Sequence, residues 1–310
     1  MILNTPDITT KVGSISLNSP LLLASGTAGY ADEMADFGSL DQLGAVVVKS
    51  LTCYPWPGNN APRLMGVTCG MVNSVGLQGD GLQRFLEKEL KKLISKKANV
   101  IISVWGQSIE DFQTCADLLK DTAKEVLAVE LNLSCPNLAQ KQIFAHDPEL
   151  TAKIVSIFSS INKPIWAKLS PNSDNYIEVA KKAVDSGADA ISAFNTLSGM
   201  AIEIDDKSQP KILLGGLSGK ALKPVSLRGV YLLRKEFKQT GIIGIGGVSS
   251  LKDVLEYLAV GADAVGIGTA NLINPRIGFR IVKALKKYLE KNKYESIEDL
   301  KLSYRKSLGI

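Results

Sequence analysis

The sequence predicts a (β/α)8 TIM barrel, an α/β fold in which eight parallel strands close on themselves and helices cover them. Eight short apolar runs, rich in β-branched residues, alternate with amphipathic segments along the 310 residues. Continuous apolar runs are typical of parallel strands that are buried on both faces. An open doubly wound sheet is the alternative, but no GxGxxG motif follows the first run to support it.

Each predicted element has its own signal. The strands are expected at 21–26, 45–50, 100–106, 127–134, 164–171, 189–196, 241–247 and 263–269. Apolar residues three and four apart predict helices at 81–96, 108–125, 147–161, 173–187, 226–237 and 249–261, with a helical tail at 275–307. Ser108 and Ser250 each precede an aspartate by three residues, as helix caps do. Gly187 and Gly261 suit the left-handed turn that ends a helix.

Two segments, 51–80 and 201–222, are longer than ordinary loops between a strand and the next helix. Both are insertions after the C-terminal end of a strand, the face on which barrel enzymes build their sites. We expect them to form lids or walls of a site. No linker or low-complexity stretch interrupts the pattern, so residues 1–310 are expected to form one domain.

Composition narrows the function. The net charge is +5, but basic residues are scattered among acidic ones with no basic block, so nucleic-acid binding is not indicated. The four cysteines are far apart and form no CxxC pair, which predicts neither a metal site nor a disulfide framework. The N-terminus does not read as a signal peptide, and no apolar run approaches the roughly 20 residues of a membrane span. We therefore expect a cytoplasmic protein without a membrane segment.

Polar residues end most of the predicted strands, and in a barrel these ends converge on one mouth. They are Ser25, Lys49, Ser103, Asn132, Lys168, Asn195 and Thr196. A single strand-end lysine can simply reach solvent, and a single asparagine can cap a turn. A whole set of lysines and amides at buried strand ends requires partners, however, which favours a binding site.

Glycine clusters follow the last strands, at 244–247, at 266–268 and at 215–219. Barrels commonly hold a phosphate there with backbone N–H groups. Tight turns are the simpler interpretation, but three clusters in neighbouring loops favour a phosphate. A flavin mononucleotide and a sugar phosphate would suit such a cradle equally well.

The string NLSCPN, residues 132–137, resembles the active-site motif of the dihydroorotate dehydrogenases, flavoenzymes of pyrimidine synthesis. The resemblance covers essentially the whole chain and includes 24–26, 48–50, 73–78, 168–171, 195–197, 216–219, 223–224, 246–247 and 268–269. With a cysteine in this motif, the chain resembles the soluble type 1 enzymes of the family. The sequences at 70–78, 168–172 and 216–219 are closer to those of type 1B. That type implies a partner, an electron-transfer subunit with FAD and a 2Fe-2S cluster, which passes electrons to NAD.

The resemblance implies that FMN oxidises dihydroorotate to orotate, with Cys135 as the base that removes the C5 proton while hydride leaves C6 for the flavin. Lys49 is the second implied catalytic residue. The implied FMN ligands are Ser25, Lys49, Ser50, Ser103, Asn132, Lys168, Phe194, Gly219, Gly246, Gly247, Gly268 and Thr269. The implied substrate ligands are Lys49, Asn73, Ser74, Val75, Gly76, Leu77, Asn132, Asn137, Asn195 and Thr196. A homodimer core and a heterotetramer with the partner are also implied.

Four residues depart from the commonest type 1B pattern: Ser103, Phe194, Gly79 and Lys220. Three alternatives stay open: a fumarate-dependent type 1A enzyme, a flavin barrel like the catalytic module of dihydropyrimidine dehydrogenase, and a non-enzymatic phosphate-binding barrel. His146, the single histidine, is an alternative base. We interpret it instead as part of the helix cap at Asp147. It is the last residue of the loop 139–146, which we expect to be a mobile lid.

Overall fold

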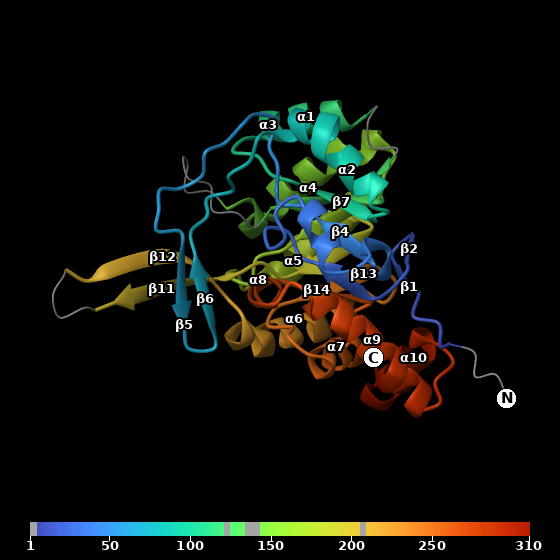
Figure 1. Ribbon diagram of the computed structural model, residues 1–310. Helices are drawn as coiled ribbons and strands as arrows, with labels where there is room; N and C mark the ends of the chain where they lie inside the picture. Colours follow the sequence, from blue (N-terminus) through green and yellow to red (C-terminus); the bar gives the residue numbers. More distant parts are fainter. Residues whose placement is uncertain (1–4, 121–124, 134–142, 205–208) are drawn as a thin grey trace.

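The computed structural model describes residues 5–120, 125–133, 143–204 and 209–310, and in this part of the chain eight parallel strands close a barrel (Figure 1). The order around the barrel is β10-β13-β14-β3-β4-β7-β8-β9. The strands are β3 (Leu21–Leu23), β4 (Ala45–Val47), β7 (Val100–Val104), β8 (Ala128–Asn132), β9 (Ile165–Lys168), β10 (Ala190–Ala193), β13 (Gly241–Ile245) and β14 (Ala264–Ile267). The predicted (β/α)8 fold is thereby confirmed, and the open sheet is excluded.

Helices surround the barrel where the apolar spacing predicts them. They are α1 (Leu82–Arg84), which continues through a π-helical turn into α2 (Leu90–Ser95), α3 (Ile109–Leu119), α4 (Pro148–Ile157), α5 (Tyr176–Asp185), α6 (Lys223–Glu236) and α7 (Leu251–Ala259). The tail forms α8 (Thr269–Ile273), α9 (Ile277–Lys291) and α10 (Ile297–Leu308). Ser108 and Ser250 cap α3 and α7 through their side chains, as predicted. Gly187 and Gly261 have φ of 106° and 110°, in the positive range expected of these turns.

Two apolar cores hold the barrel. One lies between the strands and the helices. The other fills the barrel interior and includes Trp166, and it also contains Val12, Ile15 and Leu17 of an N-terminal hairpin. This hairpin, β1 (Thr10–Val12) and β2 (Ile15–Leu17), contributes its alternate buried side chains to the interior core. The sequence analysis did not predict it, because each strand has three residues and its apolar signal is correspondingly short.

A second, four-stranded antiparallel sheet projects from the barrel (Figure 1), and we call it the roof sheet. Its order is β11-β12-β6-β5, with β5 (Leu64–Val67), β6 (Gly70–Asn73), β11 (Leu197–Glu203) and β12 (Lys211–Ser218). Both long segments predicted as lids or walls contribute strands. The second begins earlier than predicted, because β11 starts at Leu197 and not at Ala201. A separate small core of Val72, Ala201 and Leu213 holds this sheet together.

The C-terminal helix is fixed to the barrel by a buried ion network around Asp263. Its carboxylate accepts from Arg234 Nη2 at 2.6 Å and from Arg305 Nη2 at 2.9 Å. Such pairs are expensive to break once buried, so α10 is a firm part of the fold. Among the described helices, none has the length and apolar character needed to cross a membrane.

Candidate active site

A cavity of about 1030 Å³ lies between the C-terminal ends of the barrel strands and the roof sheet. It is lined by most of the predicted site residues: Ser25, Lys49, Ser50, Asn73, Ser74, Val75, Gly76, Leu77, Asn132, Lys168, Phe194, Asn195, Thr196, Gly219, Gly246, Gly247, Gly268 and Thr269. Cys135, Asn137 and the first part of the predicted lid, 139–142, lie outside the described residues. The volume of the cavity exceeds that of most single-ligand pockets, so the cavity can accommodate two ligands.

A chain of hydroxyl and amide groups forms the floor of the cavity. Asn132 Nδ2 donates to Ser50 Oγ at 2.9 Å, and Ser25 Oγ lies 3.3 Å from the same hydroxyl. Ser50 Oγ is also 2.9 Å from Ser103 Oγ. These contacts join the ends of strands β3, β4, β7 and β8, so the floor is held in place by the barrel itself.

Ser103 lies one layer behind the cavity. It is fully buried, is absent from the cavity lining, and contacts Ser50 and the carboxylate of Glu130. Its predicted role as a direct flavin ligand is therefore not supported by its position here. Its contact with Ser50 gives it instead a place in the network that orients the floor.

Lys49 follows strand β4 and brings a cation into the cavity. Its Nζ lies 4.3 Å from the centre of the Tyr30 ring, a cation–π contact. Burial lowers the pKa of Lys49, and the Asp80 carboxylate opposes that shift. The ammonium is thus partly desolvated and held near an aromatic face, where it can bind an anionic group strongly.

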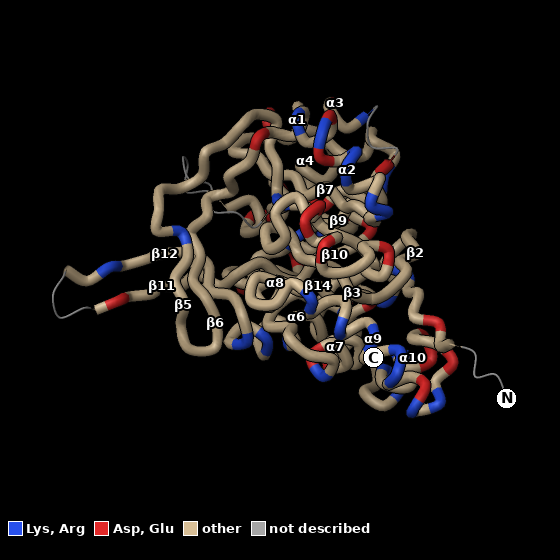
Figure 2. Tube along the Cα trace, viewed as in Figure 1, with Lys and Arg blue, Asp and Glu red and all other residues tan. Residues whose placement is uncertain are grey.

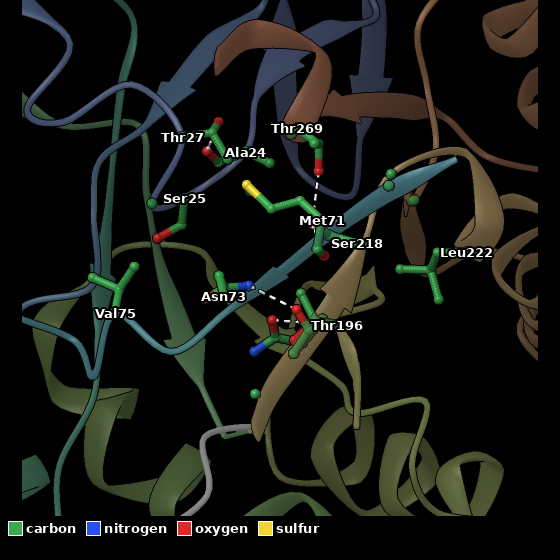
Figure 3. Close-up of a pocket in the computed structure, with 18 of the residues that line it drawn as sticks. Ala24, Ser25, Thr27, Met71, Asn73, Val75, Thr196, Ser218, Leu222 and Thr269 are labelled. Carbon is green, nitrogen blue, oxygen red and sulfur yellow. Dashed lines mark hydrogen bonds between the residues drawn. The ribbon is translucent and has the colours of Figure 1, made fainter. Parts of the chain in front are cut away.

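Amide and hydroxyl groups from both the barrel and the roof sheet line the same cavity. Asn195 accepts from the backbone N–H of Thr196 at 2.8 Å, and its Nδ2 lies 3.5 Å from Asn132 Oδ1. Asn73 of the roof sheet donates to the carbonyl of Gly216 at 3.0 Å, and Figure 3 shows its side chain near Thr196. Such groups donate and accept, which is what the edge of a planar heterocycle with carbonyl and N–H groups requires.

Glycines that follow strand β13 form a cradle in the same cavity. Gly246 and Gly247 have φ of 144° and 68°, and an added Cβ would lie 2.3 Å from Ser226 Oγ and 2.7 Å from Lys223 Cβ, respectively. Thr269 donates to Ser218 Oγ, at the end of strand β12, at 2.8 Å (Figure 3). Missing side chains leave backbone N–H groups accessible, which suits a phosphate. The residues present therefore fit the phosphate end of a flavin mononucleotide.

Of the two aromatic side chains that the sequence analysis singled out, Phe194 lines the cavity and His146 does not. Phe194 is 2% exposed, and its ring packs edge-on against Tyr176 at 5.1 Å between centroids. His146 does not line the cavity, and burial lowers the pKa of its imidazole. The side chain of Asp147, not that of His146, caps α4. The arrangement therefore gives no support to His146 as a base.

Several residues in or beneath the cavity were missed by the sequence analysis. Asn172 donates to the carbonyl of Thr196 at 3.0 Å and accepts from the N–H of Ser198 at 2.7 Å, linking the strand β9 end to the roof sheet. Asn59 donates to Ser74 Oγ at 2.9 Å. Glu130 lies directly below the floor. Its signal was available, because it is the one charged residue of the buried strand β8.

A closed barrel with a polar floor, a glycine cradle and a covering sheet defines a ligand-binding (β/α)8 protein with an enzyme-like site. The sequence model of the dihydroorotate dehydrogenase family matches residues 7–289. The chain belongs to this family.

Curated relatives extend the likeness over nearly the full chain. The "Dihydroorotate dehydrogenase B (NAD(+)), catalytic subunit" of Geotalea uraniireducens is 40% identical, covering 95% of this chain and 97% of its own length. Proteins of the same name from Maridesulfovibrio salexigens and Solidesulfovibrio magneticus are 41% and 39% identical, covering 94% and 98% of this chain and 97% and 99% of their own.

Proposed function

We propose that the chain oxidises dihydroorotate to orotate in pyrimidine biosynthesis, with FMN as its resident cofactor. The observation that carries the proposal is the joint presence, in one cavity, of a glycine cradle, the amides of Asn73, Asn132 and Asn195, and the ammonium of Lys49. The cradle suits the flavin phosphate, and the amides with the ammonium suit a pyrimidine ring that bears a carboxylate. FMN, when bound, would supply the two-electron redox chemistry.

The residues of the chain would bind, orient and deprotonate the substrate. Lys49 would pair with the carboxylate, while Asn73, Asn132, Asn195 and the Gly76–Leu77 backbone would hold the ring edge, with Ser74, Val75, Thr196 and Asn137 around it. This fixes the orientation of the reacting carbon, which is a large part of the rate gain of such enzymes. Cys135, three residues beyond the floor residue Asn132, would remove the C5 proton. A thiol acts as a base through its thiolate, so activity should rise with pH toward its ordinary pKa near 8.5.

The electron acceptor is proposed to be NAD, reached through a second chain that carries FAD and a 2Fe-2S cluster. Support comes from the names of the relatives, which describe them as catalytic subunits of NAD(+) enzymes. A homodimer of single-domain barrels, joined by two electron-transfer subunits in the cytoplasm, completes the proposal.

The test is an anaerobic half-reaction of the purified chain reconstituted with FMN. Dihydroorotate is expected to bleach the flavin absorbance, whereas dihydrouracil is not. Bleaching by dihydrouracil alone would point to a dihydropyrimidine-type barrel, and a chain that binds no flavin would contradict the proposal. Rapid turnover of the isolated chain with fumarate would replace the NAD assignment with a type 1A one.

A further inference from the structure

A carboxylate lies inside the barrel directly beneath the cavity floor. Side chains alternate between the two faces of a strand. The interior core contains Ile101, Ala128, Trp166 and Ala190 of four neighbouring strands. The residues two positions further along these strands therefore also face the interior, and they form a polar layer of Ser103, Glu130, Lys168 and Ser192.

Glu130 is tied to every other member of this layer. Ser192 Oγ donates to its Oε2 at 2.8 Å, and Ser103 Oγ lies 3.4 Å from its Oε1. Lys168 Nζ is 3.7 Å from the same Oε1. The Glu130 side chain is 1% exposed and that of Lys168 6%, so both charges are shielded from water. A buried charge is tolerated when it is paired and hydrogen-bonded, and this one is both.

Lys168 lines the cavity, whereas Glu130 does not. We propose that Glu130 is a positioning residue that holds the Lys168 ammonium in place and reduces its electric field at the bound flavin. This inference rests on the proposed function, because it takes FMN to be the group that Lys168 contacts. Glu130 acts through Lys168 and does not touch the ligand.

The consequence is a redox effect. At neutral pH the two-electron-reduced flavin is an anion, so a nearby ammonium favours the reduced form. Charges interact strongly in a shielded interior, and a carboxylate 3.7 Å from the ammonium offsets much of that preference. Removing the carboxylate charge would leave Lys168 uncompensated, and the midpoint potential of the bound flavin would shift to more positive values.

The variant Glu130→Gln tests this, since the amide keeps the shape and can still accept from Ser192. The midpoint potential of bound FMN is measured by photoreduction against indicator dyes, which needs no turnover of dihydroorotate. We expect the equilibrium between reduced and oxidised flavin to change at least tenfold, which is about 30 mV for a two-electron couple. The matched control is Ser192→Ala, which removes one hydrogen bond of Glu130 and keeps its charge, and its potential should stay close to that of the original chain.

An unchanged potential in folded, flavin-loaded Glu130→Gln would overturn the inference, as would an equal shift in Ser192→Ala. If Glu130→Gln gives no folded protein, Glu130→Asp decides, because its shorter side chain withdraws the carboxylate from Lys168. A smaller positive shift then supports the inference, and no shift overturns it. A chain that binds FMN but is not reduced by dihydroorotate would overturn the proposed function alone, since the potentials of the variants would still decide the role of Glu130.

Discussion

The floor and the roof of the cavity are built in contrasting ways. Floor residues such as Asn132 and Lys168 are each 5% exposed and sit on barrel strands that pair on both sides. The roof sheet has a core of three buried residues and leaves Met200, Ile202 and Leu214 at least half exposed. Figure 2 shows few charged positions along its strands, in contrast to the charged helices of the barrel. Sparse packing allows local opening, so the roof should move more readily than the floor.

The largest effect is expected at the thiol that follows the floor strand β8. Cys135→Ala should retain the yellow flavin but slow its reduction by dihydroorotate about 10²- to 10⁴-fold, the usual contribution of a general base. Stopped-flow measurement of flavin bleaching checks this. Cys69→Ala is the control, because Cys69 also lines the cavity but on the roof side. Near-normal reduction by Cys135→Ala would remove the base role.

The next largest effect is expected at Gly247, a glycine of the cradle with a positive φ. Gly247→Ala places a Cβ at a φ of 68° and 2.7 Å from Lys223 Cβ, which should cost about 1–3 kcal/mol and weaken FMN binding accordingly. Gly66→Ala in the roof sheet is the control, because its Cβ would meet nothing within 4 Å. Titration of apoprotein with FMN measures both. Equal affinities would show that the cradle tolerates a side chain and does not hold the phosphate.

The contrast also explains what could be predicted from the sequence. Barrel strands are buried on both faces, so each appears in the sequence as a continuous apolar run. Most of the polar residues at the strand ends line one cavity, as expected. The roof strands gave no such signal. In β12 the burial does not alternate along 211–218, so this strand lacks the period-two pattern by which a strand is predicted from sequence. Their pairing also joins segments more than a hundred residues apart, as between Gly216 and Asn73, which no local pattern encodes.

Side-chain roles within the site were harder to predict than positions. Ser103 lies at the strand position expected, but its short side chain ends behind Ser50 and does not reach the cavity. Glu130 was passed over, because its importance depends on Lys168 of the next strand. The resemblance of the motifs identified residues that line the cavity. The polar layer beneath them could be recognised only from the packing of the barrel strands.

A single buried leucine tests whether the roof acts on the pyrimidine independently of the flavin. Leu213 is 6% exposed in the small roof core, while its neighbour Ile212 is 56% exposed and does not line the cavity. Leu213→Ala should loosen the sheet that carries Asn73 and raise the KM for dihydroorotate several-fold, with FMN affinity unchanged. Ile212→Ser, the matched control, should change neither quantity. A fall in FMN affinity in Leu213→Ala would contradict the separation of floor and roof.

The smallest effect is expected at Asp80, the last residue of the segment 51–80 that contributes strands β5 and β6 to the roof sheet. It links the two regions, because its carboxylate acts on Lys49 at the end of barrel strand β4. Burial lowers the pKa of Lys49, and Asp80 raises it in part. In Asp80→Asn that opposition is lost, so the pKa of Lys49 falls further and the cation is lost at lower pH. Orotate binding, followed by flavin absorbance, should therefore be unchanged near neutral pH but begin to weaken at a lower alkaline pH than in the original chain. Asp117→Asn, on the exposed face of α3, should leave the profile unmoved. If the pH profile of Asp80→Asn coincided with that of this control, the Lys49 ammonium would not be the group that binds the carboxylate of orotate.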